Sequence, residues 1–375
     1  MNSAFIWQEL TWLMSMDKKT RITFLGDIFP AELAYTRNYG IRTQFEKHGG
    51  KPWVKQIKDI VGEKDLLIAN LESPLVNKKD IIKDTFYGHP SFTSFLRLSG
   101  IDFVNVANNH ILEQGSKGFR QTIDFLEKAK IGIVGHQENG RSKISYIHLN
   151  GLKIAMAGFS NVDLEVIKDV NHFAILREDD VIEALSEMEK EGADFKILNF
   201  HWGNEYVHIP SITQRRMAYK FIESGADVII GHHPHVIQPY EKYKDGHIFY
   251  SLGNFMFDYI HSKMISIGLV ASLEIDALKR DEVNLRGVKL SYKNTVAPMP
   301  QLEFENFYAE IKNLYSEFCK MSDDDYQIHY NRMHKKNRFR RRVAMKTSIL
   351  SEFFNVPLKH KSLLIKNVFS YYLKK

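Results

Sequence analysis

Residues 225–236 read GADVIIGHHPHV, and this stretch indicates both the fold class and the place of the chemistry. The apolar run of β-branched residues 228–230 predicts a buried strand, which stops at Gly231 and is followed by a cluster of histidines. Histidines at alternate positions, such as His233 and His235, point the same way in an extended backbone, so both imidazoles can reach one metal ion. On its own, the stretch is equally consistent with a surface loop that is rich in histidine by chance.

Four earlier strand-like runs also end at polar side chains, and this favours a shared site. Helical patterns separate the runs, and a repeated strand–helix order predicts an α/β fold with a mostly parallel sheet. Ligands bind at the carboxyl edge of such sheets. The side chains at the four ends are Asp27, Glu72, Asn109 with His110, and His201. Each could be an ordinary turn residue. With the histidine stretch there are five such strand ends, and chance is not expected to produce all five, so we predict that these side chains meet at one edge.

The predicted ligands form a mixed oxygen and nitrogen set without thiolates. They are Asp27, Glu72, Asn109, His201, His233 and His235. Such a set suits Mn, Fe, Zn or Mg. Six donors exceed the needs of one tetrahedral ion and fit two divalent metal ions about 3.5–4 Å apart, an arrangement that promotes phosphoryl transfer to water. His110 is left outside the metal shell, where it can protonate a leaving oxygen or bind developing charge.

Other enzyme classes lack their signatures in this chain. No Gly-x-Ser-x-Gly elbow follows a strand, and neither a P-loop nor a dinucleotide-binding glycine fingerprint is present. The single cysteine, Cys319, excludes an intramolecular disulfide. No run reaches the ~18 apolar residues of a membrane span, and the N-terminus lacks the features of a signal peptide. We therefore expect a cytoplasmic protein, in which residues 10–14 pack on the body or touch a membrane surface.

The positive charge is concentrated in the tail. Residues 331–375 hold thirteen Lys or Arg and one acid, Glu352, a net charge of +12, which leaves −6 for the first 330 residues. Helical patterning from about Gln301, with apolar positions at 349–354 and 363–372, suits peripheral contact with the inner face of an anionic membrane. The alternatives are a solvated helical cap on the body and contact with an acidic polymer. Nucleic acid is disfavoured, because no recognised binding module accompanies the charge.

Six motifs resemble those of the CapA family, the bacterial capsule and poly-γ-glutamate biosynthesis proteins with a calcineurin-like metallophosphoesterase fold. The likeness covers about residues 22–258, in order. The motifs are Gly26-Asp27, Asn70-Leu71-Glu72-Ser73-Pro74, Ala107-Asn108-Asn109-His110, His201-Trp202-Gly203-Asn204-Glu205, Gly231-His232-His233-Pro234-His235-Val236 and Ser251-Leu252-Gly253-Asn254-Phe255.

The resemblance implies a four-layer α/β/β/α sandwich with a dinuclear metal centre. It assigns Glu72 to the bridging position and His110 to the catalytic one. Around them we expect supporting or substrate-binding residues, with His232 either behind the ligands or at the surface. These residues are Asn108, Glu113, Glu205, His232 and Asn254.

The chain departs from the family pattern at three places. Glu113 stands where an aspartate usually follows the Asn-Asn-His motif, so its hydrogen bond is expected to be longer or shifted. Ile28 and Phe29 are bulkier than the usual residues after Asp27. Many relatives also carry an N-terminal membrane anchor, and none is visible here.

We divide the chain into an N-terminal segment (1–20), a CapA-like domain (21–300) and a helical, basic extension (301–375). The expected function is a phosphoesterase-type hydrolase in capsule, poly-γ-glutamate or related polymer synthesis, acting on an anionic polymer or a phosphorylated substrate alongside other synthesis proteins. The alternative is a non-catalytic scaffold or binding component of a membrane-associated polymer synthesis or export complex.

Overall fold

A computed structural model describes residues 19–34, 36–162, 171–258, 263–276, 281–291, 296–355, 361–362, 365–366 and 368. For residues 263 and 344–355 it describes the backbone alone. The N-terminal turn expected at residues 10–14 lies outside these ranges, as do residues 363–364, 367 and 369–372 among the apolar tail positions. None of the helices in the described ranges combines the length and the apolar character that a bilayer crossing requires.

The first sheet has eight strands and contains the strands that lead to Asp27, Glu72 and Asn109. Its order is β16-β15-β14-β1-β2-β3-β4, and β13 pairs with β1 beside this path. The strands β1 to β4 and β13 run parallel, while β14 to β16 are antiparallel. The bounds are β1 (Thr20–Ile28), β2 (Leu66–Leu71), β3 (Phe103–Asn105), β4 (Gly132–Val134), β13 (Asn254–Met256), β14 (Ile267–Ile275), β15 (Asp281–Leu290) and β16 (Val296–Pro298).

The second sheet has six strands, in the order β11-β12-β10-β9-β8-β7. Its central strands are parallel, and β7 and β11 form antiparallel edges. The bounds are β7 (Ser145–Leu149), β8 (Leu152–Ser160), β9 (Phe195–His201), β10 (Val228–His232), β11 (Tyr240–Tyr243) and β12 (Gly246–Phe249). A small ribbon of β5 (Gln137–Glu138) and β6 (Arg141–Ser142) lies between the two sheets in the chain.

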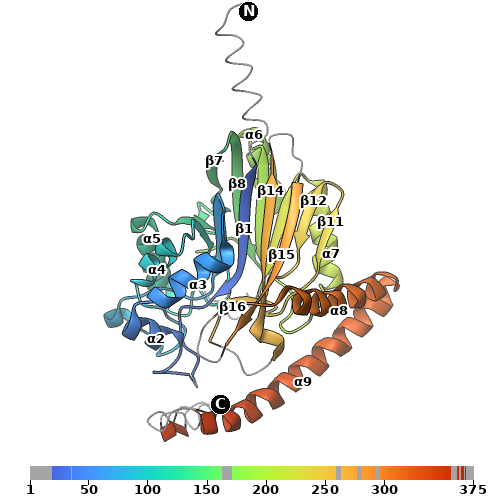
Figure 1. Ribbon diagram of the computed structural model, residues 1–375. Coiled ribbons are helices and arrows are strands. Elements are labelled where there is room, and N and C mark those ends of the chain that lie inside the picture. The colour runs from blue at the N-terminus through green and yellow to red at the C-terminus, as the bar shows by residue number, and fades with distance from the viewer. Residues whose placement is uncertain are drawn as a thin grey trace, which may run out of the picture.

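Helices cover the outer faces, so the body has the four layers α/β/β/α (Figure 1). One apolar cluster joins α2 to α5 to the first sheet, and another joins α6 and α7 to the second. A third cluster, which includes Phe24, Ile68, Ile197 and Ile230, fills the space between the sheets. The helices are α2 (Ile41–His48), α3 (Lys51–Val61), α4 (Phe92–Leu98), α5 (Gly115–Lys128), α6 (Glu178–Lys190) and α7 (Ile212–Glu223), with 3₁₀ turns η1 (Lys78–Asp80) and η2 (Lys263–Ser266). The predicted fold class is confirmed.

The expectation of one sheet is wrong, because the five strand ends belong to two. Asp27, Glu72 and Asn109 lie near the ends of strands of the first sheet, whereas His201 and His233 lie near the ends of strands of the second. A strand–helix repeat does not reveal where the chain leaves one sheet for the other. Here the change occurs after β4, through β5, β6 and the hairpin of β7 and β8. The ends still converge, because the two sheets pack face to face.

Local sequence signals explain the best-predicted elements. Asn150-Gly151 joins β7 to β8 with φ values of 51° and 86°, the left-handed pair that a tight two-residue hairpin requires. Helix α7 begins with a capping box, in which Ser211 and Gln214 exchange hydrogen bonds between side chain and backbone. The tail is helical as predicted, with α8 (Gln301–Cys319) and α9 (Asp323–Asn355). Tyrosines and phenylalanines of both helices join the apolar clusters of the body.

Candidate metal centre

The first sheet supplies two carboxylates to the centre. Asp27 lies near the end of β1 and Glu72 directly after β2, and both side chains are fully buried. Asn70 fixes the Asp27 carboxylate, since its Nδ2 donates to Oδ1 at 2.9 Å. Asn105 and Asn108 in turn donate to Asn70 Oδ1 at 3.1 and 3.3 Å. Three amides at neighbouring strand ends therefore hold one carboxylate in place.

The second sheet supplies the imidazoles. His201 is the last residue of β9, and His233 and His235 lie in the turn after β10. All three are buried, and the ring centroids of His233 lie 4.9 Å from His201 and 5.9 Å from His235. His233 and His235 have positive φ values of 95° and 56°, so the two residues are not in the extended backbone that their alternation suggested. They face the same centre because the chain turns sharply between them.

The ligand atoms of Asp27, Glu72 and His235 all lie within 4.8 Å of one another. Glu72 Oε1 is 3.7 Å from His235 Nε2 and 3.9 Å from His201 Nε2, so it lies between an imidazole from the end of β9 and one from the turn after β10. Asn109 Oδ1 is 2.9 Å from the same His201 nitrogen. A carboxylate oxygen in this position can ligate a divalent cation.

The pKa values of the two carboxylates are shifted in opposite directions. Burial alone would raise the pKa of Asp27, but His232 and His235 hold that pKa well below its ordinary value. Burial and the nearby Asp27 carboxylate raise the pKa of Glu72 well above its ordinary value. Burial and then His233 lower the pKa of His201, which keeps the imidazole neutral and able to ligate.

Within the described residues, several polar atoms of this centre are buried without a hydrogen-bond partner. They are both carboxylate oxygens of Glu72, Asp27 Oδ2 and His201 Nδ1. Orphaned buried polar atoms are rare in folded proteins, and each one costs stability unless another group satisfies it. Four such atoms in one cluster of oxygen and nitrogen donors fit a divalent cation site.

His110 lies in the loop after β3, beside the centre. Its Nδ1 is 3.3 Å from Glu113 Oε1, slightly longer than a usual N–H···O bond, and its ring stacks on Phe86 at 4.7 Å. Lys83 holds the other Glu113 oxygen at 2.6 Å. Burial would raise the pKa of Glu113, but His110 and Lys83 lower it, so the carboxylate is charged and orients the imidazole. Among the described residues, no hydrogen bond or ion pair joins His110 to Asp27 or Glu72.

The remaining predicted residues lie around the ligands. His232 is buried, with Nδ1 3.1 Å from Asp27 Oδ1, so the surface alternative for this histidine is wrong. Asn254 Oδ1 lies 2.9 Å from His235 Nδ1, which leaves Nε2 of that ring directed at Glu72. Asn108 Nδ2 donates to the Leu71 carbonyl at 2.9 Å. Glu205 is half-buried and forms a 3.0 Å ion pair with Arg341 of α9.

Several residues of the centre were not predicted from the sequence. Asn70 stood within a recognised motif, but only the neighbouring Glu72 was singled out. Tyr206, whose ring stacks on His235 at 6.2 Å, carried no signal beyond its place after Glu205. Arg341 was hidden in a run of like charges. Their roles depend on contacts between distant segments, and residue type alone does not report these.

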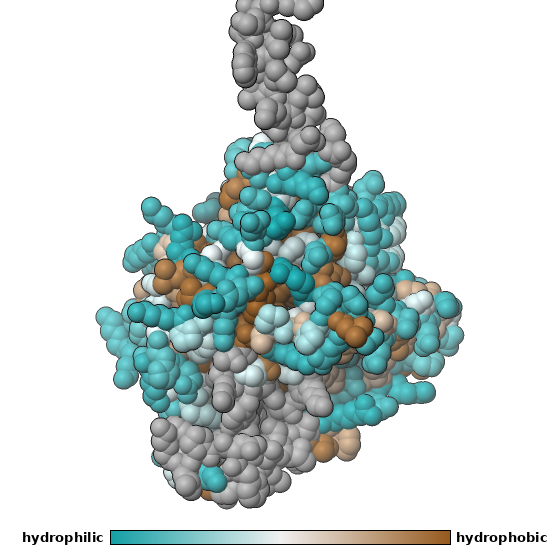
Figure 2. All heavy atoms as spheres, in the orientation of Figure 1, coloured by the Kyte–Doolittle hydropathy of each residue, from teal (hydrophilic) through white to brown (hydrophobic). Residues whose placement is uncertain are grey.

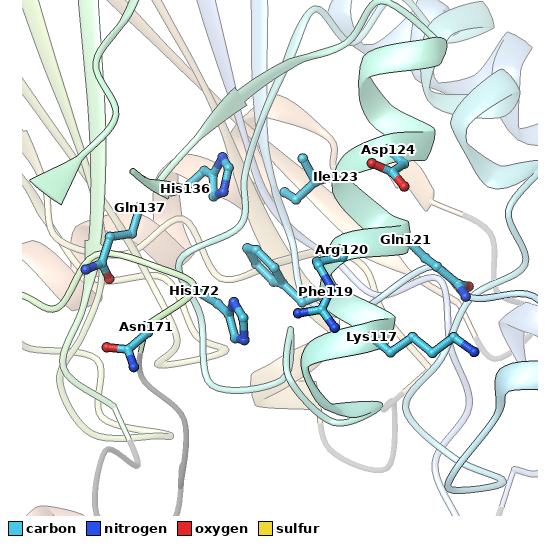
Figure 3. A pocket seen from close by; sticks show the side chains of 10 residues that line it. All are labelled: Lys117, Phe119, Arg120, Gln121, Ile123, Asp124, His136, Gln137, Asn171 and His172. Atoms are coloured by element: carbon cyan, nitrogen blue, oxygen red, sulfur yellow. The ribbon is translucent and has the colours of Figure 1, made fainter. Parts of the chain in front are cut away.

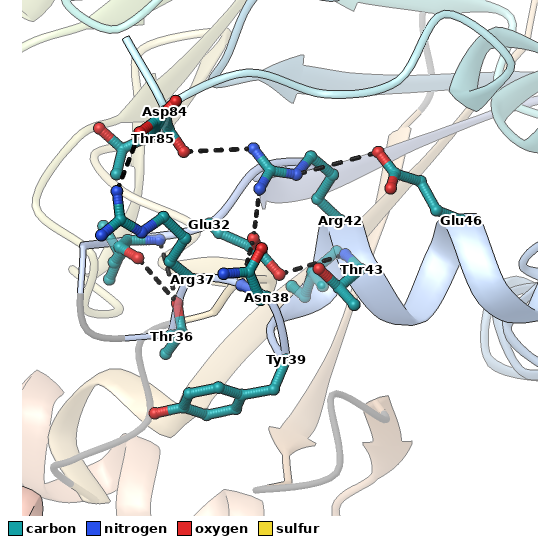
Figure 4. A network of polar contacts seen from close by, with 12 residues as sticks. Glu32, Thr36, Arg37, Asn38, Tyr39, Arg42, Thr43, Glu46, Asp84 and Thr85 are labelled. Atoms are coloured by element: carbon teal, nitrogen blue, oxygen red, sulfur yellow. Dashed lines mark hydrogen bonds and ion pairs between the residues drawn. The ribbon is translucent and has the colours of Figure 1, made fainter. Parts of the chain in front are cut away.

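A buried ion pair holds the loop that follows Asp27 (Figure 4). Glu32 is fully buried and pairs with Arg42 of α2 at 2.6 Å. Its carboxylate also accepts hydrogen bonds from the backbone N–H groups of Asn38 and Thr43. Because every oxygen of Glu32 is satisfied, this carboxylate is structural, in contrast to Glu72.

A separate cavity of about 510 Å³ lies along α5 (Figure 3). Lys117 and Arg120 of α5 line it on one side, and His136 and His172 on the other. The Phe119 ring lies between the two imidazoles, with centroids 5.7 Å from His136 and 5.2 Å from His172. None of the predicted ligands lines this cavity, so it is distinct from the metal centre.

A protein family described as "Bacterial capsule synthesis protein PGA_cap" matches residues 21–259. The chain is 30% identical over 256 residues to "Capsule biosynthesis protein CapA" of Bacillus anthracis, covering 64% of this chain and 61% of the relative. It is 32% identical over 246 residues to "PGA biosynthesis protein CapA" of Bacillus subtilis strain 168, covering 63% of each. The chain therefore spans about three-fifths of the length of these relatives.

Among solved structures, the chain resembles the calcineurin-like phosphoesterase YfkN of Bacillus subtilis. The TM-score is 0.42 at 17% identity, and the match covers 81% of this chain and 100% of the other.

Proposed function

The chain belongs to the bacterial capsule synthesis protein family, and from that membership we propose that it is a metal-dependent hydrolase of the phosphoesterase type. It acts in the synthesis of a capsule, poly-γ-glutamate or a related cell-surface polymer, on an anionic polymer or a phosphorylated substrate. The names of its Bacillus relatives support this biological role. The observation that carries the chemistry is the buried Asp27–Glu72–His235 cluster, in which both Glu72 oxygens and Asp27 Oδ2 lack hydrogen-bond partners within the described structure.

Two divalent metal ions, drawn from Mn, Fe, Zn and Mg, would be held by the predicted ligand set. That set is Asp27, Glu72, Asn109, His201, His233 and His235. When bound, such ions polarise a phosphoryl oxygen and offset the charge that develops in the transition state. The amides of Asn70, Asn105 and Asn108 orient the Asp27 carboxylate, and Asn254 directs the His235 ring.

His110 would act on the leaving group. Its Nδ1 faces the Glu113 carboxylate, so Nε2 is the nitrogen available to substrate. As the P–O bond to the leaving group breaks, the Nε2 proton passes to the leaving oxygen and the imidazole becomes neutral. The charged Glu113 faces Nδ1 of the ring and fixes its orientation.

Metal analysis followed by an activity assay tests the proposal. We expect purified protein to hold about two equivalents of a divalent transition metal and to hydrolyse a generic aryl phosphate. Asp27→Ala combined with His233→Ala should abolish both. Exposed His89, which contacts only Ser91 through its ring in the described structure, provides a control, and His89→Ala should retain both. Metal binding without turnover of any phosphoester would refute the enzymatic proposal and leave a binding platform.

A second candidate, a membrane-associated binding component, is favoured by the outer face of α9. Phe339 and Val343 are 69% and 45% exposed, and Lys335, Lys336 and Arg340 are exposed around them. Figure 2 shows a largely hydrophilic surface over the described part of this helix, with apolar atoms at its edge. Cations that surround exposed apolar groups suit peripheral contact with an anionic bilayer.

Vesicle partitioning tests the membrane contact. Replacing Lys335, Lys336, Arg340 and Arg342 with glutamine should release the protein from phosphatidylserine vesicles, since each cation contributes about 1 kcal/mol near such a surface. Vesicles of phosphatidylcholine alone should bind neither form. Equal partitioning of wild type and variant would exclude this face as the attachment site.

A further inference from the structure

One face of α9 runs along the loop between β9 and α7, although α9 lies outside the family-matched residues 21–259. Four side chains of this face contact the loop, at positions that share one side of a helix. Tyr326 Oη donates to the Pro210 carbonyl at 2.6 Å, and Tyr330 Oη lies 3.2 Å from Asn204 Nδ2. Further along, Asn337 Nδ2 donates to the Tyr206 carbonyl at 2.7 Å, and Arg341 pairs with Glu205 at 3.0 Å.

The same loop supports the histidine turn. The Tyr206 N–H donates to the Pro234 carbonyl at 2.8 Å, at the residue between His233 and His235. The Tyr206 ring stacks on His235 with an interplanar angle of 30°. The guanidinium of Arg341 also lies over this ring, 4.4 Å from its centroid. Tyr206 therefore connects α9 to the turn that carries both predicted histidine ligands, by contact with the His235 ring and with Pro234 between them.

Backbone strain explains why this connection is needed. Tyr206, His233 and His235 have φ values of 67°, 95° and 56°, in the left-handed region that residues with a side chain rarely adopt. Such conformations persist only where the surrounding contacts enforce them. The buried Asn337 amide provides one of these contacts, since it donates to the carbonyl of the strained Tyr206 itself.

We propose that α9 is an intramolecular clamp and that Asn337 and Arg341 are positioning residues for the metal centre. They hold the 204–206 segment and, through Tyr206, keep His233 and His235 in the geometry that binds metal. This inference rests on the proposed metal centre, and it assigns a role to a helix that the family match does not include.

Asn337→Ala is the decisive variant, because it removes the contact without changing the charge. Asn331→Ala is its matched control, since Asn331 is exposed on the same helix and its side chain is bonded only to Gln327 among the described residues. Mn²⁺ binding is measured by titration calorimetry and by the electron paramagnetic resonance spectrum of the bound ion. We expect Asn337→Ala to weaken Mn²⁺ binding about tenfold or more and to broaden the spectrum. Asn331→Ala should match wild type.

Hydrogen exchange in the metal-free protein tests the clamp independently of any metal. The amides of residues 204–206 and those of His233 and His235 should exchange faster in Asn337→Ala and Arg341→Gln than in Asn331→Ala and Arg342→Gln. Asn337→Leu, which fills similar volume without a donor, is used if the alanine variant shows an altered circular dichroism spectrum. It should weaken Mn²⁺ binding to the same extent.

The possible outcomes separate the two proposals. If wild type binds Mn²⁺ and Asn337→Ala binds it equally well, the clamp is refuted and the metal centre stands. If the amides exchange faster but Mn²⁺ affinity is unchanged, Asn337 stabilises the loop without positioning ligands, and the inference fails. If wild type binds no metal, both proposals fail, and the exchange data then report only a structural contact.

Discussion

Glu72→Gln should stabilise the metal-free protein while it destroys metal binding. In the described structure both Glu72 oxygens are buried without a hydrogen-bond partner, close to the Asp27 carboxylate. Glutamine has nearly the same shape, removes the buried charge and presents an amide that can donate to Asp27 Oδ2, which accepts no hydrogen bond in the described structure and lies 3.4 Å from His235 Nδ1. If replacing a residue stabilises the metal-free protein, that residue is retained for function rather than for stability.

The expected gain follows from the cost of unsatisfied buried groups. One such polar group costs about 1–3 kcal/mol, and a charged group costs more. We expect the free energy of unfolding of the metal-free variant at pH 8 to exceed that of wild type by about 1–3 kcal/mol. With Mn²⁺ present at about 100 times its Kd, the free energy of unfolding of wild type should rise by about 2.7 kcal/mol, and that of the variant should not change. The stability advantage of the variant should then disappear or be reversed. Chemical denaturation monitored by circular dichroism measures both.

The pH dependence has a defined sign. Burial and Asp27 raise the folded-state pKa of Glu72 above its ordinary value of 4.5. Wild type therefore has the full benefit of a protonated Glu72 below pH 4.5 and loses it as the pH rises through the folded-state pKa. The advantage of glutamine should be small at pH 4.5 and largest at pH 8.

Glu32→Gln is the matched control. Glu32 is as deeply buried as Glu72, but it is paired with Arg42 at 2.6 Å. Removing one member of a buried ion pair costs about 3–5 kcal/mol, so this variant should be less stable with or without metal. The reasoning would be refuted if Glu72→Gln destabilised the metal-free protein at pH 8, or if its effect did not depend on pH.

Two further predictions follow from the same geometry. His110→Ala should lower kcat on an aryl phosphate by about 10²–10⁴-fold. The metal content should stay unchanged, because His110 lies outside the ligand cluster. Loss of metal in this variant would instead show that His110 is a ligand. Mn²⁺ affinity should fall as the pH is lowered through the raised pKa of Glu72, because the protonated carboxyl cannot ligate. Calorimetry in buffers of different ionisation enthalpy would detect the proton that Glu72 releases when the metal binds. A Kd that does not depend on pH would contradict the assignment of Glu72 as a ligand.

The strand ends could be predicted from sequence because the relevant signals are local. An apolar run followed by Asp27, Glu72 or His201 marks the end of a buried strand, and each of these residues lies where its run predicted. The Asn150-Gly151 hairpin was equally clear, because few residue pairs adopt two consecutive left-handed conformations. Such features depend on neighbours within a few positions.

The contacts between distant segments could not be predicted in this way. Whether the strands formed one sheet or two depends on the packing of their faces, and both arrangements bury the same apolar runs. Arg341 belongs to a run of cations in which nothing in the sequence distinguishes the one that reaches Glu205. The left-handed backbone of Tyr206 also has no signature, since tyrosine does not favour positive φ.

The division of the ligands between two sheets determines how the metal centre is built. The eight-stranded sheet carries the carboxylates and the six-stranded sheet the imidazoles, and β13 connects them, since Asn254 pairs with Asp27 in the backbone register and touches the His235 ring. The distances between ligands are therefore set by the apolar layer between the sheets, where Phe24 of β1 packs on Phe249 of β12. A site that needs its groups placed to within about 1 Å thus depends on residues that never touch the ligands. Substitutions in that layer should alter metal binding through the spacing of the sheets, even where the ligands themselves are intact.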